Sequence, residues 1–179
     1  MQNASVRFRI ALWLIMLVGG GILGFFLDCR WFPGLCRNIG WHVFSAVPGL
    51  ILMKLVMASS KTTGRTLARH GRQGDLPRFE TNTLVTTGPY GCMRHPMHLG
   101  LLFMPLALAM ILGSPAFILI IAPLEMIFMV VMIMIFEERE ASRKFGEAYT
   151  RYRNTVPAFN FRLDCLKKLM KADRAQQVE

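Results

Sequence analysis

The sequence predicts an all-α integral membrane protein with about four transmembrane helices in two hairpins, plus a cytoplasmic amphipathic helix near the C-terminus. Hydrophobic residues make up 53% of the 179 residues, and the mean hydropathy is +0.38. This apolar content is concentrated in four long runs, which is typical of membrane helices. Lys and Arg are unevenly distributed around the runs, and this asymmetry indicates their orientation.

Each apolar run predicts one helix. The runs cover residues 10–27, 39–57, 99–112 and 116–136. A spanning helix needs about 20 apolar residues, so the first, second and fourth runs are long enough. The third run is shorter, and we expect it to be tilted, extended by its flanking residues or only partly spanning. The first run is too long for the apolar part of a secretory signal and lacks a small-residue cleavage site.

We expect a single membrane domain over residues 1–179. Its segments are a first hairpin, a cytoplasmic loop, a second hairpin with a further C-terminal helix, and a basic tail, over residues 10–57, 58–98, 99–160 and 161–179. Pro33 and Gly34 predict a tight turn in the outer loop of the first hairpin. The long polar loop is typical of functional rather than merely connecting segments.

The positive charge of the chain indicates a membrane surface rather than a nucleic acid as its partner. The net charge is +10, but Lys and Arg cluster in the N-terminal tail, in the long loop and after residue 136. The short outer loop carries only Arg30 and Arg37. By the positive-inside rule, both termini and the long loop are expected in the cytoplasm. The basic stretch at residues 167–174 is expected to contact anionic headgroups.

The four cysteines indicate no metal site, because none of them has the spacing of Cys and His ligands. Cys29 and Cys36 fall in the predicted outer loop, where an oxidising compartment permits a disulfide. Two free thiols are the favoured interpretation. Cys92 and Cys165 are expected in the cytoplasm and unpaired.

Residues 88–100 combine a rigid turn, a cation, two histidines and a helix start. Pro96 suits the first helical turn, where its missing N–H costs nothing. Arg94 beside a helix N-terminus is a candidate anion site. The alternative is simple anchoring, because Arg, His and Tyr all favour headgroup depth.

Glu137 and Glu138 form a pair of adjacent carboxylates at the end of the fourth predicted helix. Negative charge at a helix C-terminus opposes the helix dipole. Arg94, Arg139 or a cationic ligand is expected to compensate it, unless the pair is merely a solvated helix end.

Glu125 lies near the middle of the fourth run, where a carboxylate costs about 3 kcal/mol unless it is paired or hydrated. Lys54 and His42 are candidate neighbours. A protonated Glu125 bonded to a neighbouring helix is the equally weighted alternative.

An ordered set of short motifs between residues 60 and 160 resembles the isoprenylcysteine carboxyl methyltransferase and phospholipid methyltransferase superfamily. The set begins with Gly64–Gly71 in the loop and continues through residues 84–90, Arg94-His95-Pro96, Gly100, Glu137-Glu138, Phe145-Gly146, Tyr149, Tyr152 and Val156-Pro157. Each motif alone is weak, and their order and spacing carry the resemblance.

The resemblance implies methyl transfer from S-adenosylmethionine to a lipophilic acceptor. It implies a cofactor site at Asn82, Thr83, Leu84, Val85, Tyr90, His95, Pro96, Met97, His98 and Glu137, with Glu137 binding the amino group. Arg94, His98 and Glu138 are the candidate catalytic residues. An amine acceptor has to arrive neutral or be deprotonated, for which Glu138 and His98 are the candidate bases.

Three departures from the family pattern bear on the acceptor. His98 stands where the family usually has tyrosine. Ile133 stands where enzymes that methylate a prenylcysteine carboxylate place an arginine, so the fork that would bind that carboxylate is absent. The closing pattern after Val156-Pro157 is also altered, and Arg162 is a candidate substitute.

The expected partners are the membrane and a lipid or lipophilic small molecule, such as an isoprenylcysteine-like carboxylate, a phospholipid amine or a thiol. A bacterial inner membrane is favoured over the endoplasmic reticulum. The acceptor atom and the oligomeric state stay open. The alternatives are a non-catalytic member of the fold and a protein that resembles sterol reductases and binds a nicotinamide cofactor.

Overall fold

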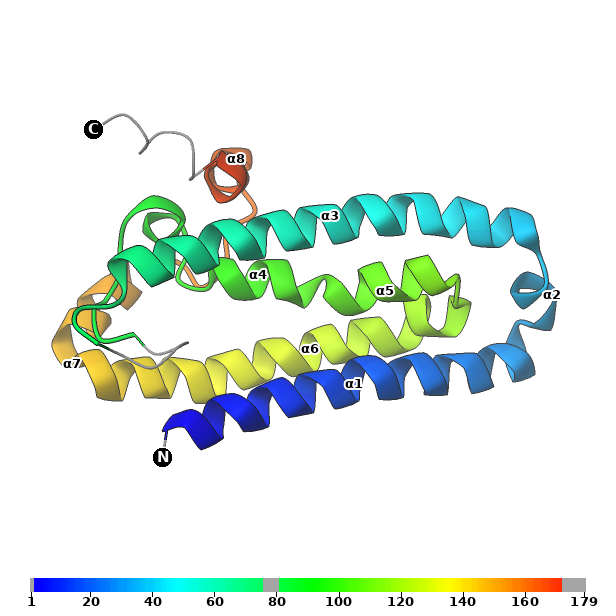
Figure 1. Cartoon of the computed structure of the whole chain (residues 1–179), viewed down its shortest axis with the longest axis horizontal. Coiled ribbons are helices and arrows are strands. Elements are labelled where there is room, and N and C mark those ends of the chain that lie inside the picture. Colours follow the sequence, from blue (N-terminus) through cyan, green and yellow to red (C-terminus); the bar gives the residue numbers. More distant parts are fainter. Residues whose placement is uncertain (1, 76–80, 172–179) are drawn as a thin grey trace. The chain divides into compact units, whose positions relative to one another are not determined.

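The computed structural model describes residues 2–75 and 81–171, and within these ranges the chain is helical and has no strand (Figure 1). The elements in chain order are α1 (Gln2–Trp31), α2 (Pro33–Cys36), α3 (Ile39–His70), η1 (Gly88–Gly91), α4 (Pro96–Leu102), α5 (Met104–Leu112), η2 (Phe117–Ile121), α6 (Ala122–Met132), η3 (Ile133–Glu137), α7 (Glu138–Thr155) and α8 (Leu163–Lys171).

Three stretches of the described helices are long and apolar enough to cross a bilayer: Phe8–Trp31, Ile39–His70 and Phe117–Thr155. They contain the first, second and fourth apolar runs. The third run forms α4 and α5, which together cover Pro96–Leu112 and are separated at Phe103. Pro105 lies in the first turn of α5, where a proline does not disrupt helical hydrogen bonds. The all-helical membrane class is therefore supported, and the fourth crossing stays a prediction.

The chain forms two compact units, and each unit joins distant segments. One unit comprises Met1–Lys54 and Leu102–Val131, and the other comprises Leu55–Leu101 and Met132–Glu179. The two units are described separately below.

The first unit is built around Phe117, whose side chain is fully buried. Helix α1 packs against η2 and α5. Glycines of α1 make this approach possible, because a Cβ on Gly24 would lie only 2.9 Å from the Cβ of Phe117. Ala109, Ile121 and Ala122 complete the buried cluster.

Hydrogen bonds join the two hairpins of the first unit to each other near their turns. Asp28 accepts a 2.8 Å hydrogen bond from the backbone N–H of Ala116. Gly113 ends α5 in the left-handed conformation, and its carbonyl accepts a 2.8 Å bond from Trp41 Nε1. Ser45 donates to the Met110 carbonyl at 2.7 Å.

Glu125 lies in the first unit, with its side chain buried next to Gly20 of α1. Its Oε2 has no hydrogen-bond partner among the described residues. His42, a candidate neighbour in the sequence, instead places its Nε2 2.9 Å from the carbonyl oxygen of Cys36.

In the second unit, the loop that carries the Arg-His-Pro motif is attached to the segment following α7. The backbone N–H groups of Arg94 and His95 donate to the carbonyls of Pro157 and Ala158 at 2.9 and 3.1 Å. The Tyr152 hydroxyl donates to the Tyr90 carbonyl at 2.5 Å. These bonds connect segments that are about sixty residues apart in the sequence.

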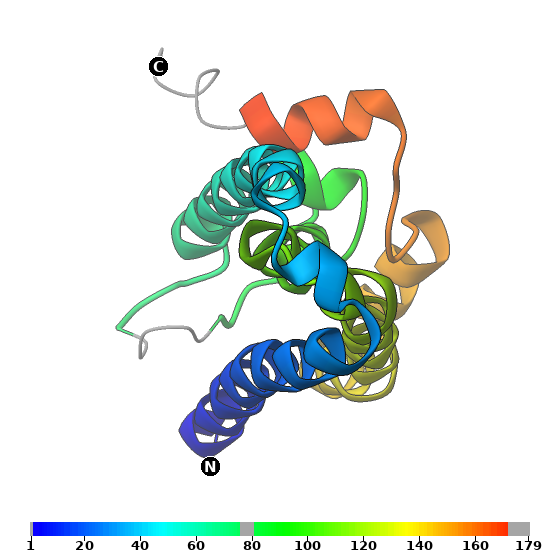
Figure 2. The same cartoon turned by 90° about the vertical axis from the view of Figure 1, so that its right-hand side faces the viewer.

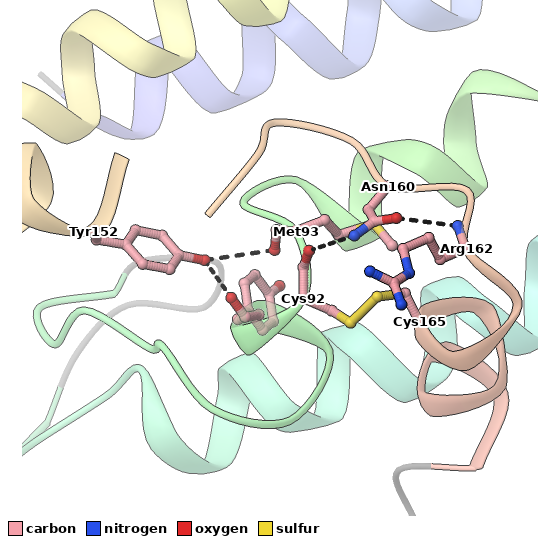
Figure 3. Close-up of a disulfide and its surroundings, with 7 residues drawn as sticks. Cys92, Met93, Tyr152, Asn160, Arg162 and Cys165 are labelled. Atoms are coloured by element: carbon pink, nitrogen blue, oxygen red, sulfur yellow. Dashed lines mark hydrogen bonds between the residues drawn. A yellow bond between two sulfur atoms is a disulfide. The ribbon is translucent and has the colours of Figure 1, made fainter. Parts of the chain in front are cut away.

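Two features of the C-terminal region differ from expectation. The basic tail predicted over residues 161–179 contains helix α8, which Figure 2 shows along its length. The expectation that Cys92 and Cys165 are unpaired is wrong, because they form a disulfide with a Cα–Cα distance of 5.7 Å (Figure 3). Only the return of the tail onto η1 brings together two residues separated by 73 positions. Cys29 and Cys36 are free, as favoured.

Candidate functional site

A cavity of about 160 Å³ lies in the second unit, between the end of α3, the loop before α4, and α7. Its walls are mostly apolar and aromatic, with a few charged groups. The lining residues are Leu67, Thr81, Thr83, Leu84, Val85, Tyr90, Arg94, His95, Met97, His98, Glu137, Ala141, Phe145, Tyr149 and Tyr152.

Most residues of the predicted site line this cavity, but three do not. The Asn82 side chain bonds to the backbone N–H and carbonyl of Gln73, both at 2.8 Å. Pro96 is fully buried in the first turn of α4. Glu138 is also buried and does not contribute to the cavity wall.

Helix α7 contributes a part of the wall to which no role was assigned from the sequence. Helical spacing predicts that Glu138, Ala141, Phe145, Tyr149 and Tyr152 share one face of this helix, and all of these except Glu138 line the cavity. Their spacing is therefore the signal by which they could have been included. Leu67 and Thr81 had no such signal. Leu67 takes part because α3 continues to His70, through residues that were assigned to the loop.

Glu138 is the centre of a buried ion pair. Its Oε1 accepts hydrogen bonds from Arg94 Nε at 2.9 Å and from His95 Nε2 at 2.7 Å. The Arg94 side chain is 9% exposed and that of Glu138 is 5% exposed. Arg94 Nη1 also donates to the carbonyls of Arg153 and Val156. Arg94 and Glu138 thus neutralise each other's charge, as expected for charges buried together. Glu138 Oε2 has no hydrogen-bond partner among the described residues and lies 3.5 Å from Arg153 Nε.

The geometry around His95 determines which ring nitrogen carries the proton. Since a carboxylate only accepts hydrogen bonds, the Nε2 of His95 must carry a hydrogen toward Glu138. Burial lowers the pKa of His95, while the hydrogen bond to Glu138 partly opposes this effect. His95 is therefore favoured as a neutral ring that donates from Nε2.

Glu137 has different surroundings from Glu138. Its Oε1 lies 3.6 Å from His98 Nε2, and its side chain is 26% exposed. Successive residues of a helix point about 100° apart, so one carboxylate can line the cavity while the next is turned into the protein. Glu137 is also the last residue of the π-helical turn η3. Such turns are frequent at functional sites.

Tyr90 supplies a polar atom without a partner. Its side chain is 7% exposed and lines the cavity. The hydroxyl has no hydrogen-bond partner among the described residues. Burial raises the pKa of Tyr90, so the hydroxyl stays protonated and able to donate.

Together these groups suit a ligand with a positive charge and an apolar or aromatic portion. Glu137 provides negative charge at the cavity, and Leu84, Val85 and Met97 provide apolar contact. The Tyr90 hydroxyl can satisfy a polar atom of the ligand. Most small-molecule sites combine an apolar wall with a few polar groups in this way.

Comparison with known proteins gives a consistent result. A family model described as phospholipid methyltransferase matches residues 44–148. Protein-S-isoprenylcysteine O-methyltransferase of Schizosaccharomyces pombe is 27% identical over 164 residues, covering 83% of this chain and 66% of that protein. Protein-S-isoprenylcysteine O-methyltransferase B of Arabidopsis thaliana is 26% identical over 147 residues, covering 81% of this chain and 71% of that protein. The chain thus spans about two thirds of the length of these curated relatives.

Proposed function

Because this chain belongs to the phospholipid methyltransferase family of membrane methyltransferases, we propose that it transfers a methyl group from S-adenosylmethionine to a lipophilic acceptor. The single observation that best supports this donor is the position of Glu137. Its carboxylate lies at an otherwise largely apolar cavity, next to His98. A carboxylate in that setting suits a cationic ligand.

The residues around the cavity fit the parts of this donor. Glu137 would hold the ammonium group, and Leu84 and Val85 would contact the adenosine. The unpartnered Tyr90 hydroxyl would bind a polar atom of the nucleoside or the amino acid. The cavity of about 160 Å³ is smaller than the roughly 300–1,000 Å³ usual for ligand sites, so we expect its rim to move on binding.

The donor supplies an electrophilic methyl group on a sulfonium. With this donor bound, the methyl–sulfur bond would break with its electron pair left on sulfur, while the acceptor heteroatom would form the new bond to carbon. The protein has to hold the two reactants in line at short distance, which contributes up to about 7–11 kcal/mol. The bonds that join Arg94 and His95 to Glu138 would hold the two walls of the cavity at a fixed distance from each other for this purpose.

We assign positioning roles to two of the candidate catalytic residues. Arg94 donates to Glu138 and to nearby carbonyls, and Glu138 Oε1 accepts from both Arg94 and His95. His98 is the better candidate for a base, because its side chain is 29% exposed and faces Glu137. It would remove the proton from an amine acceptor, and a thiolate or carboxylate would need no such step.

The surroundings of the cavity favour an amine or thiol acceptor over a carboxylate. Arg94 is the one guanidinium among the described lining residues, and it is already bound to Glu138. Ile133, at the position where prenylcysteine enzymes place an arginine, is apolar and buried. The similar proteins of S. pombe and A. thaliana nevertheless make a prenylcysteine carboxylate the principal competitor.

We further propose that the reaction takes place at the cytoplasmic face, in a bacterial inner membrane rather than the endoplasmic reticulum. The donor would enter from the cytoplasm and the lipophilic acceptor sideways from the bilayer. The concentration of Lys and Arg in the termini and the long loop supports this orientation.

The donor assignment is tested by titrating the purified protein with S-adenosylhomocysteine in a calorimeter. Glu137→Gln removes the charge with little change of shape and should weaken binding about 10–100-fold, because a bond to a charged group contributes about 1.5–3 kcal/mol. Glu147→Gln, an exposed position of α7, is the matched control and should bind normally. Unchanged affinity in Glu137→Gln would refute its assigned role. Binding of a nicotinamide dinucleotide instead would indicate the reductase alternative.

The acceptor is tested with labelled donor and protein in lipid nanodiscs. Phosphatidylethanolamine, a lipophilic thiol and a prenylcysteine are offered separately, and methylated lipid is extracted and counted. Transfer to the amine or thiol with none to the prenylcysteine is the expected result. Exclusive transfer to the prenylcysteine would contradict the acceptor preference while leaving the donor assignment intact. Donor binding without transfer to any acceptor would favour the non-catalytic alternative.

A further inference from the structure

Helix α8 has one face against the protein and one that is uncovered. Cys165 and Leu169 are buried, one turn apart. Leu163 is 72% exposed and Met170 is also exposed. Phe161, just before the helix, is 61% exposed. Three exposed apolar side chains therefore lie at or just before α8, outside the long candidate membrane spans.

The positions of these residues make an apolar edge beside positive charge. Leu163 and Met170 are seven residues apart, so they lie on the same side of the helix, two turns from each other. Lys167 lies between them along that side, and Lys168 and Arg162 are likewise exposed. Asp164 is the acidic residue of this helix. An exposed helix side that carries both apolar residues and lysines is typical of helices that lie in the membrane interface.

The direction of α8 within the second unit fits such a placement. In Figure 1 the helix is seen end-on while α3 runs across the view, and in Figure 2 α8 is seen along its length. Helix α8 thus runs across the direction of residues 55–70 of α3. Because α3 belongs to a candidate membrane span, a helix that runs across it is suited to lie along the membrane surface.

Specific bonds hold α8 in this orientation. The Cys92–Cys165 disulfide joins its first turn to the loop after η1 (Figure 3). Asn160 donates from Nδ2 to the Cys92 carbonyl at 3.3 Å and accepts from the Arg162 backbone N–H at 3.0 Å. The exposed edge is therefore fixed relative to the loop that leads directly to Arg94 and His95.

We propose that α8 and Phe161 form an interfacial anchor that binds the surface of a bilayer containing anionic lipids. Leu163, Met170 and Phe161 enter the headgroup–acyl boundary, while Lys167 and Lys168 contact anionic headgroups. Each basic residue near such a surface contributes about a fivefold preference for anionic lipid. A second copy of the chain is a poorer occupant, because a symmetric contact would place the same lysines opposite each other.

The experiment uses the full-length protein with a tryptophan at the exposed apolar edge, Leu163→Trp. It is reconstituted in nanodiscs containing brominated lipid, either zwitterionic or with about a third anionic lipid. Quenching by the lipid is measured, and the signal of the parent protein, which has its own tryptophans, is subtracted. Lys167→Gln/Lys168→Gln removes the two charges of α8. Arg143→Gln/Arg151→Gln removes two exposed charges of α7 and is the matched control.

We expect strong quenching in anionic discs and weaker quenching in zwitterionic discs. The ratio of quenched to unquenched protein in anionic discs should fall about fivefold for each lysine removed, and the control should not change it.

Equal quenching in both kinds of disc would overturn the role of anionic lipid. Access of aqueous acrylamide to the introduced tryptophan in both discs would show that the edge faces water and overturn the anchor. Protection from both quenchers would overturn it in favour of a protein partner. None of these readings depends on donor binding or turnover.

Discussion

Glu137 and Glu138 are neighbours in the sequence whose side chains have different environments. Glu138 is bonded to Arg94 and His95 and is buried, whereas Glu137 lies at the cavity next to His98. The same chemical group therefore has two different environments one residue apart. We attribute stability and alignment to Glu138 and donor binding to Glu137, and this division can be tested separately for each residue.

Glu138→Gln is expected to destabilise the protein, because it leaves the Arg94 charge buried without a counter-charge. Breaking a buried ion pair in this way costs about 3–5 kcal/mol. The free energy of unfolding is measured by denaturant titration in detergent micelles. Glu147→Gln changes the same charge at an exposed position and should stay within about 0.5 kcal/mol of the parent protein. Equal stability of the two variants would contradict the structural role of Glu138.

The His95 ring is expected to make stability depend on pH. Burial lowers its pKa in the folded protein, so between that pKa and the ordinary value of about 6.5 the unfolded state binds more protons. The contribution of His95 is thus complete above about pH 6.5 and is lost as the pH falls through the folded value. His98, Glu137, Glu138 and Arg94 are the charged groups around it. Unfolding midpoints measured from pH 8 to pH 5 should fall less steeply in His95→Gln than in the parent protein.

At the scale of secondary structure elements, α7 connects most parts of the site. Its first residue is Glu138, its inner face lines the cavity, and Tyr152 bonds to the Tyr90 carbonyl. The helix is interrupted at Gly146, which has φ 54° and ψ −130°. Side-chain-bearing residues rarely adopt this conformation. The kink therefore depends on glycine, and it lies between Phe145 and Tyr149 of the cavity wall.

Gly146→Ala is expected to cost about 1–3 kcal/mol of unfolding free energy, through backbone strain alone. A Cβ at this position meets no other atom within 4 Å, so steric overlap does not contribute. Gly64→Ala in α3 is the matched control, because its Cβ also meets nothing within 4 Å and its conformation is helical. The control should be stabilised by about 0.5–1 kcal/mol. A neutral or stabilising effect of Gly146→Ala in thermal unfolding would mean that α7 can straighten.

At the scale of the whole molecule, each compact unit joins segments that the sequence separates. In the second unit, residues around Tyr90 and Arg94 pack with the end of α7 and with α8. The Cys92–Cys165 disulfide is the covalent part of this association. At the cytoplasmic face proposed above, both thiols would be kept reduced, so the bond is expected only where the protein meets an oxidising environment, such as purification in air.

Alkylation of the unfolded protein, purified in air without reductant, is expected to label Cys29 and Cys36 alone. After reduction, all four cysteines should be labelled, as counted by mass spectrometry. Loss of the disulfide should lower the unfolding free energy by about 2–4 kcal/mol, because the unfolded chain regains freedom. Labelling of all four cysteines before reduction would show that the purified protein lacks the bond.

The sequence was sufficient for the helical class, the three long spans and the family, because these depend on local hydrophobicity, charge and short motifs. Helical spacing also grouped Ala141, Phe145, Tyr149 and Tyr152, which line the cavity, but it included Glu138, which does not. Several points could not be decided from the sequence alone. The local sequence does not distinguish the roles of Glu137 and Glu138, and it does not indicate which residue pairs with Cys165.

Helix α8 could have been predicted from the sequence, because Leu163, Leu166 and Leu169 follow helical spacing. Its basic residues instead led to the prediction of a basic tail. The partner of each buried group depended on the tertiary structure. Arg94 meets Glu138, and Cys92 meets Cys165, only after α7 and the tail return to the loop before α4. Local patterns determine which elements form, whereas contacts between distant segments determine which charges are neutralised and which side chains remain available to a ligand.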